Sequence, residues 1–104
     1  MAKFPFSDLH SFKDFVGFVK LCAPDMFPER EGLGQEDQWT LDLAFEGLRN
    51  GIKLAVAEKG DRPEFEECKV LIEDAKSAYL LDRRKEAYLK LDAVSKLLKK
   101  IPTQ

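Results

Sequence analysis

The stretch that decides the fold is residues 41–56, LDLAFEGLRNGIKLAV. Its large apolar residues recur at intervals of three or four: Leu41, Phe45, Leu48, Ile52 and Val56. This spacing places them on one face of an α-helix, which must be buried against other parts of the chain. We expect the helix to extend over residues 36–59 and to end at Gly60, because glycine readily adopts the backbone conformation that follows a helix.

Three further segments carry the same helical spacing, whereas strand-like alternation is absent. They predict helices over 7–22, 62–80 and 82–100. Residues suited to cap these helices precede or begin each of them: Ser7 or Asp8, Asp61, and Asp82. Four amphipathic helices predict an all-α, four-helix antiparallel bundle, with residues 1–104 forming a single domain.

The junction between the third and fourth helices allows two interpretations. No Gly or Pro stands between Glu64 and Ile101, but the polar run 82–86, DRRKE, interrupts the apolar pattern. We favour a tight turn there. One continuous helix is the alternative, and it would leave half of its apolar stripe to be covered by a second chain.

Two features of the chain indicate contacts beyond a simple core. Residues 23–38 form a long connection with five acids against one Arg, and a loop of this length in a small domain is usually functional or mobile. Beside the apolar stripe of the second helix lie Gly47, Gly51 and Ala55. Because glycine inside a helix costs about 0.5–1 kcal/mol, these small residues predict a close helix–helix interface. We favour an interface within the chain over a homodimer.

The composition argues against most catalytic and metal chemistry. The chain has one histidine, and its two cysteines, Cys22 and Cys68, form no C-x-x-C pair. No zinc, di-iron, calcium or phosphate-loop motif is present. We therefore expect no cofactor, no metal and no enzymatic activity. Both thiols are expected to be reduced, and the absence of a long apolar run predicts a soluble, cytoplasmic protein without a membrane segment.

The leading hypothesis is a non-enzymatic protein-interaction or adaptor module. Several aromatic residues and a methionine lie at predicted helix edges or in loops, beyond what the four stripes need: Phe4, Phe6, Phe18, Met26, Phe27 and Trp39. Such residues are enriched at the centres of protein interfaces. Their alternative role is to close the open end of the bundle. The partner would be another protein or a second copy of the chain.

A first alternative function rests on the segment His10-Ser11-Phe12-Lys13. It resembles the H-x-[LF]-K core of histidine phosphotransfer domains, which are small four-helix bundles. The resemblance implies that His10 accepts a phosphoryl group and that Lys13 helps to neutralise it. The alternative is a surface histidine near a helix start.

A second alternative function is weak binding of nucleic acid by the C-terminal helix. Residues 82–104 hold seven Lys and Arg against three acids, whereas residues 1–81 hold ten against sixteen. The cations of the fourth helix are Arg83, Arg84, Lys85, Lys90, Lys96, Lys99 and Lys100. These positions go round the helix, however, and do not line one face. With a net charge of −2 for the whole chain, we consider nucleic acid an unlikely partner.

Overall fold

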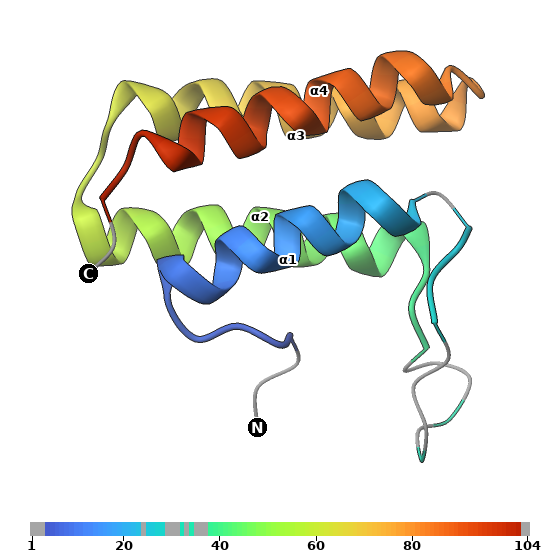
Figure 1. The fold of residues 1–104 in the computed structure, drawn as a ribbon, viewed down its shortest axis with the longest axis horizontal. Helices are drawn as coiled ribbons and strands as arrows, with labels where there is room; N and C mark the ends of the chain where they lie inside the picture. Colours follow the sequence, from blue (N-terminus) through green and yellow to red (C-terminus); the bar gives the residue numbers. More distant parts are fainter. Residues whose placement is uncertain (1–3, 24, 29–31, 33, 35–37, 103–104) are drawn as a thin grey trace.

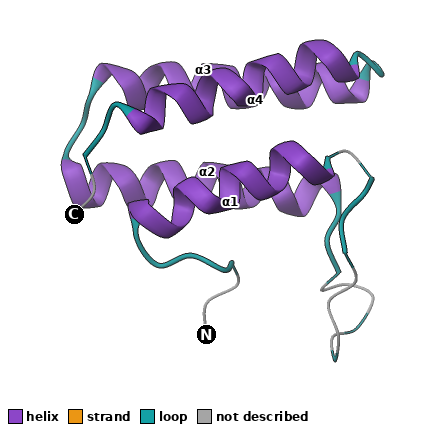
Figure 2. Cartoon of the chain, viewed as in Figure 1, coloured by secondary structure: helices purple, strands orange, loops and turns teal. Residues whose placement is uncertain are grey.

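The computed structural model describes residues 4–23, 25–28, 32, 34 and 38–102, which form four helices and no strand (Figures 1 and 2). The helices are α1 (Leu9–Cys22), α2 (Leu41–Lys59), α3 (Pro63–Leu80) and α4 (Arg84–Lys99). Neighbouring helices run antiparallel, and each packs against two others: α1 with α2, α2 with α3, α3 with α4, and α4 with α1. The predicted all-α four-helix antiparallel bundle is thus confirmed.

The core combines apolar faces from all four helices. Phe12 of α1, Phe45 of α2, Phe65 of α3 and Leu91 of α4 are completely buried, and no polar or charged residue of the described chain is buried with them. The stripe that predicted α2 accounts for this packing, because its central residues fill the core while its two ends are partly buried.

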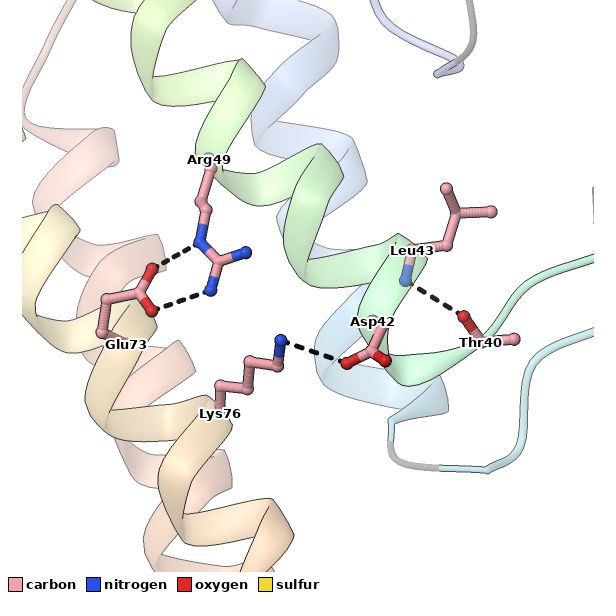
Figure 3. A network of polar contacts seen from close by, with 6 residues as sticks. All are labelled: Thr40, Asp42, Leu43, Arg49, Glu73 and Lys76. Carbon is pink, nitrogen blue, oxygen red and sulfur yellow. Dashed lines mark hydrogen bonds and ion pairs between the residues drawn. The ribbon is translucent and has the colours of Figure 1, made fainter.

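The first two helices begin at side-chain caps. The Asp8 carboxylate accepts from Ser11 N at 2.8 Å, and Ser11 Oγ accepts from Asp8 N at 3.3 Å, which completes a capping box. At α2 the Thr40 hydroxyl accepts from Leu43 N at 3.1 Å (Figure 3). The predicted start at residue 36 is therefore wrong. Thr40 has an extended backbone, with φ −132° and ψ 167°, so the helix begins only at Leu41; residues 35–37 lie outside the described residues.

The two helices of the second hairpin begin without the predicted aspartate caps. The N-cap of α3 is Arg62, not Asp61, and the helix starts at Pro63, whose ring presets a helical φ. The N-cap of α4 is Arg83, not Asp82. Both predictions of a cap are corrected because each aspartate lies one residue too early in the chain to receive the free N–H groups of the first turn.

Asp82 has a different role, which produces the turn between α3 and α4. Its φ of +59° lies in the left-handed region. Asp82 N donates to Tyr79 O at 3.0 Å and Arg83 N donates to Ala78 O at 2.8 Å, the bond pair of a Schellman motif. The interpretation of this segment as a hairpin is confirmed, and the continuous helix is excluded. Gly60, with φ +84°, ends α2 as predicted.

Candidate functional site

Seven aromatic side chains form one continuous cluster beside α1 and α2. They are Phe4, Phe6, Phe12, Phe15, Phe18, Phe27 and Trp39, called here the aromatic cluster, and the ring centroids of contacting pairs lie 5.1–6.4 Å apart. These separations fall in the range in which tilted and offset rings attract one another. The structure thus brings together five of the six residues singled out for partner binding. Each of these five is partly buried and packed against the core.

The small residues of α2 make room for this cluster. A Cβ atom added to Gly47 would lie 2.8 Å from Phe15 Cζ, and one added to Gly51 would overlap the ring of Phe12. Ala55, one turn further along, is completely buried. The stripe of Gly47, Gly51 and Ala55 therefore lies inside the molecule, with the rings of α1 against its two glycines.

One side of the aromatic cluster is hollowed into a groove of about 370 Å³, called here the aromatic groove. It is lined by Pro5, Ser11, Asp14, Phe15, Phe18 and Trp39. Phe15 is only 3% exposed and so contributes to the base, whereas Phe18 and Trp39 are half-buried. The rings of Phe15, Phe18 and Trp39, whose centroids lie 5.4–6.0 Å from one another, thus form an apolar wall and floor.

The two polar side chains of the aromatic groove differ in whether they already have a bonding partner. Ser11 Oγ donates to the Asp8 carboxylate at 2.7 Å, so its hydroxyl belongs to the cap of α1. Asp14 is exposed, and no hydrogen bond or ion pair joins it to another described residue. The Asp14 carboxylate, which no described residue neutralises, therefore stands at the edge of an aromatic surface.

Phe18 and Trp39 were named from the sequence as candidate binding residues, but Pro5, Asp14 and Phe15 of this groove were not. The spacing along α1 holds a usable signal, because Ser11, Phe15 and Phe18 stand at i, i+4 and i+7, and Asp14 lies four residues before Phe18. These positions share one side of α1, where the buried stripe gives way to the surface.

Met26, the sixth predicted partner-binding residue, lies outside the ring contacts. It follows the end of α1, where its N–H donates to Cys22 O at 2.7 Å, and it is 74% exposed. Leu21, in the last turn of α1, is 81% exposed. These two exposed apolar side chains lie where the chain leaves α1 (Figure 1).

His10 and Lys13 have separate environments. His10 is exposed in the first turn of α1. Lys13 Nζ donates to Ile101 O at 2.7 Å, just beyond the end of α4. Partial burial, with a smaller contribution from the nearby Lys59, lowers the pKa of Lys13. Lys13 therefore has a structural partner, and phosphotransfer stays an untested hypothesis that no contact favours.

The basic residues of α4 are largely paired with acids of the same chain. Arg84 contacts Asp25 at 3.6 Å, and Lys96 contacts Asp92 at 3.1 Å. Further pairs are Arg83 with Glu86 and Lys90 with Asp74. The cations that have no ion pair with a described residue, Lys85, Lys99 and Lys100, stand near opposite ends of the helix. This arrangement offers no continuous basic strip for a phosphate backbone.

Within the described residues, no three His, Cys, Asp or Glu side chains are grouped so as to hold a metal ion. None of the four helices has the length and apolar character of a membrane span in the part of the chain that the structure describes. Comparisons with protein-family models, curated proteins and solved structures found no match.

Proposed function

We propose that this chain is a non-catalytic interaction module that binds a peptide segment of a partner protein in the aromatic groove. The observation that carries the proposal is the combination of Phe15, Phe18 and Trp39 with the carboxylate of Asp14, which pairs with no described residue, in one groove of about 370 Å³. That volume is near the lower end of ligand sites, about 300–1,000 Å³, and suits one or two side chains.

The chemistry of the groove favours a basic side chain with an apolar neighbour. Aromatic faces carry negative electrostatic potential and attract Lys or Arg, whose long aliphatic stems also pack on rings. Asp14 supplies a carboxylate for the cationic head. Residues 1–81, which contain the whole groove, hold ten cations against sixteen acids, and an excess of acids favours association with a basic partner.

Selection from a random peptide library tests the proposal, with Asp14→Asn protein used for counter-selection. We expect the selected peptides to contain Lys or Arg beside an apolar residue. Trp39 is the only tryptophan of the chain, so its fluorescence reports directly on occupation of the groove. Replacing the basic residue of a selected peptide by Glu should weaken binding at least tenfold.

Matched variants separate the groove from general charge effects. Asp14→Asn should raise the Kd about tenfold, the size expected when a cation loses one partly desolvated partner. Glu67→Gln makes the same charge change at an exposed residue of α3 and should leave the Kd within twofold. Equal effects of the two substitutions, or equal binding of Lys and Glu peptides, would contradict the proposal.

A second copy of the chain is the other protein that the groove could accept. Light scattering coupled to size exclusion at two concentrations distinguishes this case. A mass near 11.9 kDa at both concentrations assigns the groove to a different protein. A dimer that dissociates on Asp14→Asn substitution would instead make self-association the function of the groove.

A further inference from the structure

A second groove, of about 280 Å³, lies between α2 and α3 and is called here the cationic groove. It is lined by Arg49, Ile52, Lys53, Lys69, Ile72 and Glu73. The two isoleucines are each 1% exposed, so they lie at its base among the buried core residues. Its rim is charged, with three cations and one acid. This groove combines an apolar floor with a positive rim, the reverse of the charge at the aromatic groove.

The acid of the rim is already neutralised. Arg49 Nε donates to Glu73 Oε2 at 2.6 Å and Arg49 Nη2 donates to Glu73 Oε1 at 2.8 Å (Figure 3). These bonds are the main cause of the lowered pKa of Glu73, which therefore stays ionised and paired. A guanidinium has five N–H donors, so three of those of Arg49 are not used by Glu73. The pair thus contributes donors to the groove without adding negative charge.

Of the remaining two cations, Lys69 is in an ion pair with Glu66, and Lys53 supplies the uncompensated positive charge among the described residues. Lys69 Nζ donates to Glu66 at 2.8 Å, which uses one of the three N–H groups of its ammonium. Lys53, on the facing helix, is exposed and has no ion pair with a described residue. The two side chains line the groove from opposite walls, one on α2 and the other on α3.

We propose that the cationic groove binds a small amphipathic carboxylate. The carboxylate is held by Lys53 and Lys69, and the aliphatic chain lies over Ile52 and Ile72. The volume of the groove equals that of about nine water molecules at roughly 30 Å³ each, which suits a chain of about six to eight carbon atoms. This ligand site is independent of the peptide site, because the two grooves share no residue.

Octanoate is the probe for this proposal, with octanol, octylamine and acetate as matched compounds. Titration of ¹⁵N-labelled protein should give saturable amide shifts confined to the turns of α2 and α3 around Arg49, Lys53, Lys69 and Glu73. Octanol lacks the charge and acetate lacks the chain, so each should bind at least tenfold more weakly than octanoate. Octylamine should not bind in this groove, because its ammonium is repelled by the rim.

Charge variants decide whether the two lysines hold the anion. Lys53→Gln combined with Lys69→Gln should raise the Kd for octanoate at least tenfold. Lys85→Gln combined with Lys99→Gln removes the same charge from α4 and should change the Kd less than twofold. The proposal is overturned if octanol binds as tightly as octanoate, if the two double variants behave alike, or if the shifts map to the aromatic groove. None of these outcomes depends on peptide binding to Trp39.

Discussion

The ring of Phe12 occupies the space that a side chain at residue 51 would need. A Cβ atom added to Gly51 would overlap three atoms of that ring, Cε1, Cδ1 and Cζ. Phe12 is completely buried in the core, so moving its ring would require the surrounding core residues to repack. The close approach of α1 and α2 therefore depends on glycine at this position.

The first prediction is that Gly51→Ala destabilises the protein. Helix propensity alone would favour alanine by about 0.5–1 kcal/mol. Overpacking of a filled core costs about 1–3 kcal/mol, and it outweighs that gain. We expect a net loss of about 1–2 kcal/mol in the free energy of unfolding, measured by urea denaturation. An unchanged midpoint would show that α1 moves away from α2 at no cost.

The second prediction concerns Gly17, which serves as the matched case. This residue lies within α1, and a Cβ atom added to it would meet nothing within 4 Å. With no clash, only helix propensity remains, so Gly17→Ala should stabilise the protein by about 0.5–1 kcal/mol. Circular dichroism during thermal unfolding would detect the expected rise in Tm. A fall would mean that the open space beside Gly17 is needed.

The presence of the four helices could be predicted from the sequence, because the buried face of a helix requires apolar residues every three or four positions. The first residue of each helix was harder to predict, because it depends on a single capping side chain and not on a repeated pattern. The second helix was expected to begin at residue 36, yet its N-cap is Thr40. Likewise, Asp61 and Asp82 are common capping residues, but each precedes the actual N-cap by one position.

The candidate site was predictable only in part. Loop and edge aromatics were recognisable as surplus to the four stripes, and five of the six gather in the aromatic cluster. The spacing of Ser11, Phe15 and Phe18 places them on one side of α1, but the groove also needs Pro5 and Trp39, which join them only through tertiary packing. The cationic groove was missed altogether, because Lys53 and Lys69 come from different helices and become neighbours only through the packing of α2 against α3.

The third prediction is that the left-handed backbone at position 82 restricts which residues are tolerated there. Asp82 has φ +59°, a conformation that costs most residues about 1–2 kcal/mol but is free for glycine. Asp82→Gly should therefore leave the stability unchanged or increase it by up to about 1 kcal/mol, whereas Asp82→Val should lower it by about 1–2 kcal/mol. Urea unfolding of both variants provides the comparison. Equal stabilities would argue against the Schellman turn between α3 and α4.

The fourth prediction is that the two thiols differ in reactivity. Burial, with smaller contributions from Glu67 and Glu64, raises the pKa of Cys68 to about 12, so almost none is thiolate near neutral pH. Cys22 is free and only half-buried. A chromogenic disulfide reagent should titrate one thiol in the native protein and two in guanidinium chloride. Cys22→Ser should abolish the native reaction, and a surviving fast reaction would place Cys68 at an accessible position.

The fifth prediction concerns the pH dependence of the Arg49–Glu73 pair. The bond from Arg49 lowers the pKa of Glu73 in the folded protein below its ordinary value of 4.5. The pair therefore stabilises the fold above that value, and its contribution is lost as the pH falls through the lower folded pKa. Because the two side chains are 41% and 54% exposed, we expect only about 0.5–1 kcal/mol at neutral pH.

The measurement is the difference in unfolding free energy between the protein and its Glu73→Gln variant, taken at about pH 7 and about pH 3. The difference should be largest at neutral pH and shrink in acid, because the protonated carboxyl of Glu73 and the amide that replaces it are then both uncharged. Glu67→Gln is the control, since Glu67 is exposed and has no ion pair with a described residue. A difference that stays constant with pH would mean that Glu73 stabilises the protein through packing and not through its charge.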